Sequence, residues 1–187
     1  MADHDTAPSK LISPTGRASF PYLFTPRASD EGGEPKFALT LIFDEAAQKS
    51  PEFAAIKEAV KKCIAETYKG KPPANLKLPF RKGEEKEHLD GYDPGTVFIT
   101  ATSKRRPQVV GPNMAALGED DFYPGCYARA SLRVFSYERK GNKGISFGLG
   151  NVQLVRDGER LGGGARAEDD FQPVASAAGS DLDDLLS

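Results

Sequence analysis

Residues 126–155 read CYARASLRVFSYERKGNKGISFGLGNVQLV and carry the strongest indication of the fold. Cys126–Arg139 alternates in character with the period of two that a β-strand imposes. Gly141-Asn142-Lys143-Gly144 has the composition of a hairpin turn, and Ile145–Val155 is the expected partner strand. Gly148 and Gly150 predict a bulge or sharp bend there, as a closing barrel needs.

Further strands and one helix are predicted upstream. Lys36–Phe43 (KFALTLIF) and Thr96–Thr102 (TVFITAT) read as strands, and Gly16–Phe20 has strand character. A helix is expected to begin after Ser50, a good N-cap, with Pro51 in its first position and Gly70 at its end. Its apolar stripe has spacings of three and four and consists of Phe53, Ile56, Val60, Cys63, Ile64 and Thr67.

These elements fit one mainly β domain within the 187 residues. We expect a small barrel with one α-helix and loop insertions, of which residues 71–94 form a long excursion. Residues 1–10 are expected to be disordered, residues 11–160 to form the domain, and residues 161–187 to form a flexible acidic tail. The polar N-terminus lacks a signal peptide and no apolar run reaches membrane-spanning length, so the expected location is the cytoplasm, with no membrane partner.

Charge is unevenly distributed along the chain. The net charge is −2, but residues 1–166 hold all 25 Lys and Arg against 21 acidic residues, a net charge of +4. Residues 167–187 hold six acidic residues and no basic ones. A mildly basic body with an acidic tail is compatible with nucleic-acid binding despite the low overall pI.

One strand face is the main candidate for binding. Even positions from Ala128 to Ser136 are small or apolar and suit a barrel interior. The odd face carries rings and guanidinium groups, which suit base stacking and phosphate binding: Tyr127, Arg129, Arg133, Phe135 and Tyr137. Core packing of an individual ring remains the alternative.

Three other clusters place rings beside basic residues. Lys104, Arg105 and Arg106 directly follow a predicted strand and can neutralise phosphates. Phe80, Arg81 and Lys82 have Tyr92 nearby in the sequence, and Tyr22 and Phe24 precede Arg27. We include all of these except Arg27 in the candidate nucleic-acid site.

The tail is a second candidate region. Leucines lie among aspartates after a Gly/Ala/Ser tether, at Asp181, Leu182, Asp183, Asp184, Leu185 and Leu186. Such a peptide can bind a partner protein, or compete with phosphates for a basic groove. A solvated end without a specific role is the alternative.

Signals for catalysis are weak, and neither a cofactor nor a metal is expected. Cys63 and Cys126 are interpreted as small core residues. One alternative function is a metal-dependent nuclease using Asp90 and Asp93 with the acidic run 119–121. Another is a structural or adaptor β-barrel whose rings contact proteins.

Several motifs resemble a known family. Tyr123–Ala130 (YPGCYARA), Lys143–Gln153 (KGISFGLGNVQ) and Asp157-Gly158-Glu159 are similar to the bacteriophage single-stranded DNA-binding protein family, which has an OB fold. Thr15–Phe20 and the strand at 36–43 fit as well. The resemblance implies a five-stranded OB-fold barrel with insertions.

The resemblance also implies a function. It predicts sequence-tolerant binding that coats and protects single-stranded DNA in phage replication or recombination, in the host bacterial cytoplasm. Replication or recombination proteins are the expected partners of the acidic tail. Weaker binding of duplex DNA or RNA, and homodimer formation, stay open.

Overall fold

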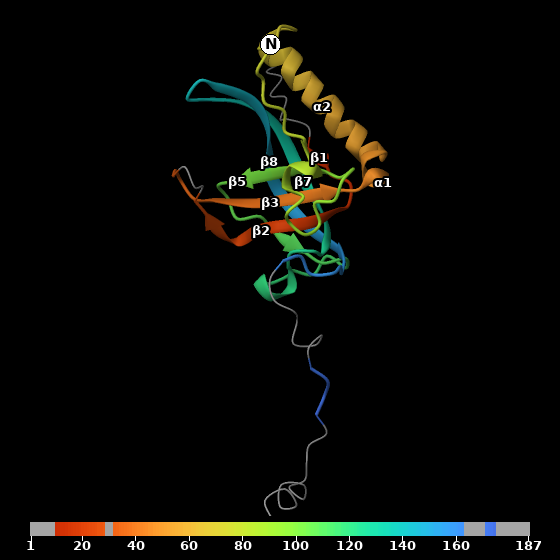
Figure 1. The fold of residues 1–187 in the computed structure, drawn as a ribbon. Coiled ribbons are helices and arrows are strands. Elements are labelled where there is room, and N and C mark those ends of the chain that lie inside the picture. The colour runs from red at the N-terminus through yellow and green to blue at the C-terminus, as the bar shows by residue number, and fades with distance from the viewer. Residues whose placement is uncertain (1–9, 29–31, 163–170, 175–187) are drawn as a thin grey trace, which may run out of the picture.

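The computed structural model describes residues 10–28, 32–162 and 171–174. Most of the described chain belongs to strands and one long helix (Figure 1). The elements in order are β1 (Leu11–Ile12), β2 (Gly16–Arg27), β3 (Lys36–Phe43), α1 (Glu45–Gln48), α2 (Pro51–Tyr68), β4 (Arg81–Lys82), η1 (Gly83–Lys86), β5 (Val97–Ser103), β6 (Val109–Val110), η2 (Glu119–Asp121), β7 (Tyr127–Arg139) and β8 (Asn142–Arg156).

Five strands close into a barrel. β2 pairs with β3, β3 with β5, β7 with β8 and β2 with β7, all antiparallel, and the parallel pair β5–β8 completes the ring. In chain order these strands have the connectivity of an OB-fold barrel, with β3 and β5 as its second and third strands. The predicted fold class is therefore confirmed.

Alternation along β3 shows how the sequence builds the core. Leu39, Leu41 and Phe43 are buried inside the barrel beside Ile99 and Ala101 of β5. Because side chains on a strand alternate between faces, Ala38 and Thr40 lie on the outer face. The barrel therefore has a filled apolar interior and presents small side chains on part of its outer surface.

Helix α2 closes one end of the barrel. Ser50 caps it by accepting a hydrogen bond from the Phe53 backbone N–H at 3.2 Å, and Pro51 occupies the first turn. Phe53, Ile56 and Val60 are buried in the core, as the apolar stripe predicts. Thr67 is exposed, however, and Tyr68 packs in the last turn instead.

The excursion 71–94 covers part of the outer face of the barrel. Tyr92 is 1% exposed and forms a second small core with Ile42, Phe98 and Leu161. Its hydroxyl donates a hydrogen bond of 2.8 Å to the buried Ser19 hydroxyl. This covering leaves only the other half of the β3–β5 outer face open.

Two irregularities shape the strands. β8 carries a bulge opposite Ser131, where the register shifts between Ala130–Val152 and Leu132–Leu149, and Gly150 lies in this bulge as predicted. β2 continues through Pro21 instead of ending before it, with a register shift between Ser19 and Tyr22.

Both cysteines are free thiols. Cys126 is fully buried, which raises the pKa of its thiol to about 11, and Cys63 is half-buried on α2. None of the described helices has the length and hydrophobicity needed to cross a membrane.

Candidate nucleic-acid interface

One row of residues crosses five strands on the outer face of the barrel. Tyr22 of β2 faces Ala38 of β3, Ala38 faces Thr102 of β5, Thr102 faces Gly148 of β8, and Gly148 faces Arg133 of β7. We call this set the central row. A ring stands at one end and a guanidinium group at the other, and three small residues between them keep the floor low.

A second pair extends this floor along the strands. Thr40 and Thr100 face each other, and their hydroxyl oxygens are 2.9 Å apart in a hydrogen bond. Thr100 is exposed. The floor thus offers hydroxyl groups and no bulky side chain, which lets an extended ligand approach the sheet closely.

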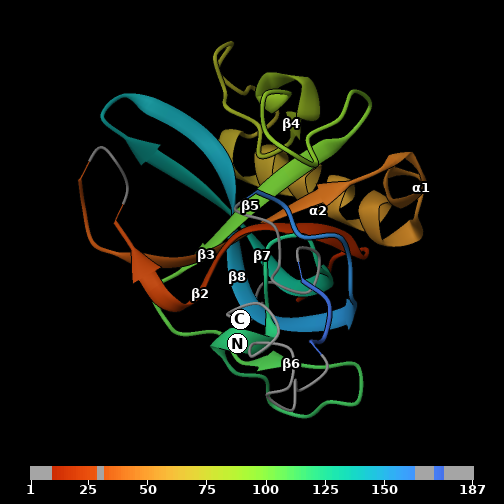
Figure 2. The ribbon, with the colours of Figure 1, turned by 60° about the horizontal axis from the view of Figure 1, so that its bottom comes forward.

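A groove of about 710 Å³ lies over the part of this floor that Ala38, Thr100 and Thr102 form, and we call it the basic groove. Gly148 and Arg133 continue the row beyond its lining. Figures 1 and 2 show that the β2–β3 and β7–β8 hairpins project from the same side of the barrel. Among the described residues, the charged ones lining the groove are Arg27, Lys36, Lys86, Lys104, Arg139 and Glu34. Five cations against one carboxylate give the groove a strongly positive field.

Tyr22 is held in place on one wall of the basic groove. Nη1 of Arg27 donates a hydrogen bond to the Tyr22 hydroxyl, and the guanidinium carbon lies 5.1 Å from the ring centroid. The ring is half-buried and lines the groove. A fixed ring beside a cation suits stacking on an unpaired base.

Lys86 marks the border between the covered and open parts of the face. Its ammonium nitrogen lies 5.3 Å from the Phe98 ring centroid and 5.6 Å from that of Phe20. Partial burial, with a contribution from nearby Arg81, lowers its pKa. Because Lys86 lines the basic groove where the excursion 71–94 closes it, its ammonium group brings positive charge to that end.

The predicted face of β7 has the expected parity but does not form one site. Arg133 lies across Gly148, since a methyl group built on Gly148 would be 3.6 Å from its Nε. Phe135 is 42% exposed on the β7–β8 hairpin, and Tyr137 packs over Gly144. These residues continue the face of the central row, and Arg139 beyond them lines the basic groove.

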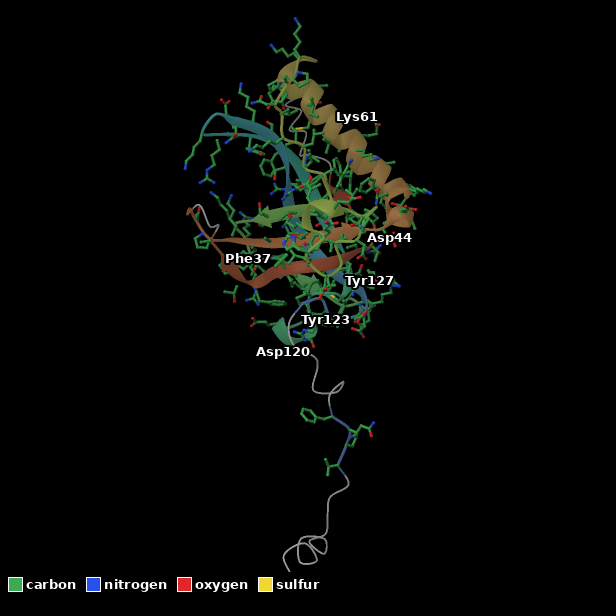
Figure 3. All side chains as sticks on the ribbon, viewed as in Figure 1. Phe37, Asp44, Lys61, Asp120, Tyr123 and Tyr127 are labelled. Atoms are coloured by element: carbon green, nitrogen blue, oxygen red, sulfur yellow. The ribbon has the colours of Figure 1, made fainter. Side chains whose placement is uncertain are left out.

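Tyr127 and Arg129 lie at the opposite end of the barrel. Figure 3 shows Tyr127 far from the β7–β8 turn, and about 33 Å of extended strand separates Tyr127 from Tyr137. The Arg156 guanidinium carbon is 3.9 Å from the Tyr127 ring centroid, and Nε of Arg129 donates a 2.8 Å hydrogen bond to Gln153. The predicted face over Tyr127–Tyr137 thus extends between two ends of the barrel, and only the Arg133–Tyr137 part of it continues the central row.

The loop after β5 is divided in a similar way. Lys104 lines the basic groove and lies 3.4 Å from a Glu34 carboxylate oxygen. Arg105 is exposed, and the Arg106 guanidinium lies 5.4 Å from the Phe24 ring centroid. Phe24 is half-buried against the core and lines a different groove.

The cluster around residue 80 requires correction. Tyr92 has no free face for stacking because it is buried under the excursion. The Phe80 ring packs between Phe53 and Phe147, with centroid distances of 5.6 and 5.8 Å. We therefore remove both rings from the candidate site.

The two cations beside Phe80 are exposed. Arg81 Nε lies 2.9 Å from a Glu85 carboxylate oxygen and its guanidinium 5.1 Å from the Phe98 ring centroid, and Lys82 belongs with it to β4. Neither lines the basic groove.

Several groove residues were absent from the predicted set. Lys36, Lys86 and Arg139 line the basic groove, as do Thr100 and Thr102. The small outward-facing residues of the Lys36–Phe43 and Thr96–Thr102 strands were the available signal, because a floor of Ala and Thr between charged ends leaves room for a ligand. Lys86 had no comparable signal.

Two other predicted features can be placed only in part. The tail residues 181–186 lie outside the described residues. In the part of the chain that the structure describes, no three Asp, Glu, His or Cys side chains gather as a metal site would require. Asp121 instead accepts a 2.8 Å hydrogen bond from the Gly118 N–H, so the nuclease alternative gains no support.

Comparison with known proteins agrees with this architecture. The chain is 29% identical over 178 residues to protein p50 of Acyrthosiphon pisum secondary endosymbiont phage 1, covering 89% of this chain and 94% of that one. The structure of this chain is similar to that of the single-stranded DNA-binding protein from bacteriophage Enc34 in complex with ssDNA. The TM-score is 0.71 at 24% identity, and the match covers 82% of this chain and 89% of that one.

A more distant solved structure has the same fold. It is gp2.5, a single-stranded DNA-binding protein of bacteriophage T7, with a TM-score of 0.60, 15% identity, and 89% and 98% of the two chains covered. The family profile described as the Enterobacter phage Enc34 ssDNA-binding protein matches residues 9–185, which is nearly the whole chain. The chain therefore belongs to the Enterobacter phage Enc34 ssDNA-binding protein family.

Proposed function

We propose that this protein binds single-stranded DNA in the basic groove, with little sequence preference. The central row carries the proposal, because it places Tyr22 and Arg133 on either side of a low floor that a strand can follow. In OB folds, the face of the second and third strands and the flanking hairpin loops are the usual nucleic-acid surface. Here that face belongs to β3 and β5.

Electrostatics supports the same location. Five cations line the basic groove and can neutralise backbone phosphates, which provides affinity without reading sequence. Tyr22 offers a stacking surface, and stacking tolerates any base because every base has a π-face. Membership of the family supports single-stranded rather than duplex DNA as the ligand.

The biological role proposed is coating and protection of single-stranded DNA during phage replication or recombination. This role requires binding and no chemical step by the protein. From the charge distribution of the sequence, the acidic tail is proposed to contact partner proteins or to compete with DNA for the groove.

Two arginines of the same strand provide a matched test. Arg133 and Arg129 are both exposed and both lie on the outer face of β7, but only Arg133 belongs to the central row. We expect Arg133→Ala to weaken binding of an oligo-dT strand about tenfold, as loss of a charged hydrogen bond does. Arg129→Ala should leave the affinity within about twofold. Fluorescence anisotropy at fixed salt measures both.

Equal losses in the two variants would show that the DNA does not distinguish the two ends of the barrel. A loss confined to Arg129→Ala would move the binding site to the Tyr127–Arg156 end. Either result would contradict the proposed location.

A further inference from the structure

A second groove, of about 610 Å³, lies on the other side of Tyr22. Its walls come from β2 and from the segment around η2, and its rim is charged. We call it the aromatic groove, after the rings of Phe20, Tyr22, Phe24 and Tyr123 that line it, with Glu119, Asp120 and Arg160 at its rim. Figure 3 shows Asp120 and Tyr123 together below β2.

Phe20 is displayed by a backbone conformation that a bulky residue rarely adopts. Its φ is +45°, in the left-handed region, and its ring side chain is 41% exposed. The strained residue lies at the register shift that follows Ser19. The Ser19 hydroxyl accepts a hydrogen bond from the buried Tyr92 hydroxyl, which fixes the strand before the shift. A surface ring kept exposed at a conformational cost is a frequent mark of a binding site.

Tyr123 on the opposite wall is fixed as well. Its hydroxyl donates a 2.8 Å hydrogen bond to Asp157 and accepts one of 3.2 Å from the Gly158 N–H. The Arg160 guanidinium lies 5.8 Å from its ring centroid. The groove thus presents orientated rings from two separate elements, which suits a flat aromatic ligand.

The rim charges decide which part of a nucleotide fits. Glu119 and Asp120 outnumber Arg160 at this rim and disfavour a phosphate beside them. A carboxylate readily accepts hydrogen bonds from an exocyclic amine such as the cytosine N4 group. Uracil and thymine carry a carbonyl oxygen at that position, and an oxygen lone pair facing a carboxylate is unfavourable. The groove is therefore suited to an amine-bearing base.

The two grooves are neighbours on either side of Tyr22. Tyr22 lines both of them, and Lys86, which lines the basic groove, also lies 5.6 Å from the Phe20 ring centroid. We propose that the aromatic groove receives a nucleobase from the strand bound in the basic groove, and that Glu119 and Asp120 make it favour cytosine over uracil or thymine. This inference rests on the proposed function and adds a base preference to it.

The test compares oligo-dC with oligo-dU of equal length at pH 8. The two bases differ along one edge, at position 4 (amine or carbonyl) and at N3 (acceptor in cytosine, N–H donor in uracil), so the ratio of dissociation constants reports recognition of that edge. We expect the wild type to bind oligo-dC at least about fivefold more tightly, the effect of about 1 kcal/mol. Glu119→Ala with Asp120→Ala should bring the ratio close to one. Asp121 is retained because it caps the Gly118 N–H.

The ratio also removes a confounding effect. Deleting two carboxylates strengthens the attraction for any DNA strand, but it does so equally for both oligomers. Phe20→Ala should weaken binding of oligo-dC more than that of oligo-dU, since stacking orientates the amine.

Each other outcome has a defined meaning. Equal wild-type affinities for the two oligomers would overturn the base preference and leave DNA binding in the basic groove intact. Absence of binding to either would overturn both proposals. If Phe20→Ala instead converts a dimer to a monomer in sedimentation while DNA affinity is unchanged, the aromatic groove is an interface between two copies, and the proposal is overturned.

Discussion

Removing two lysines from the rim of the basic groove should reduce the salt dependence of DNA binding by a calculable amount. Lys36 and Lys104 both line the groove, and Lys104 lies 3.4 Å from Glu34. On single strands, each phosphate neutralised contributes about −0.7 to the slope of log affinity against log salt. Lys36→Ala with Lys104→Ala should therefore make the slope shallower by about 1.4, or by less if Glu34 already neutralises Lys104 in part.

That change corresponds to a clear difference in affinity. Over a fourfold rise in salt, from about 50 to 200 mM, a slope difference of about 1.4 alters the relative affinity about sevenfold. Fluorescence anisotropy of labelled oligo-dT across that range measures it for the wild type and for the double variant. Glu34→Gln should act in the opposite direction and tighten binding at low salt.

Helix α2 offers the matched control. Lys61 and Lys62 are exposed, each beside a glutamate, and Figure 3 shows Lys61 on the helix away from both hairpins. Lys61→Ala with Lys62→Ala removes the same charge and should leave the slope unchanged. If the two double variants alter the slope equally, the effect is one of overall charge, and the reasoning for a localised groove fails.

Three further predictions concern stability and the tail. Tyr92→Phe removes the buried hydrogen bond to Ser19 and should lower the free energy of unfolding by about 1 kcal/mol. Calorimetry should then show a fall of about 2–4 °C in Tm, and an unchanged Tm would contradict the prediction. Gly150→Val places a Cβ 2.3 Å from the Ser131 hydroxyl oxygen and should lower the free energy of unfolding by about 2 kcal/mol. Urea titration measures this loss, and an unchanged unfolding midpoint would contradict the prediction. Removing residues 167–187 should tighten DNA binding, and equal or weaker affinity would argue against competition by the tail.

Much of the barrel could be predicted because its strands follow local rules. The alternation in Lys36–Phe43 and the glycines of the return strand give the element types and the site of the bulge directly. Ser50 and Pro51 likewise mark the start of α2. These signals depend on nearest neighbours in the chain, which a single sequence displays.

The candidate site was predicted less well because it depends on long-range placement. Parity along β7 correctly separates Arg133 from the interior, but it does not show that Tyr127 lies at the other end of the barrel. Nor does local pattern show that Tyr92 folds back over the sheet, since an aromatic in an irregular polar segment resembles an exposed one. The floor of the groove arises only when registers across five strands are known.

A backbone amide NMR titration with oligo-dT tests the location of binding most directly. If DNA binds in the basic groove, the largest chemical-shift changes fall on residues 36–40 and 100–104, with further changes on residues 133–139 and 144–148. Residues of α2 and the region around Tyr127 and Arg156 should change little. Shift changes centred on Tyr127 and Arg156, with β3 and β5 unaffected, would contradict binding in the basic groove.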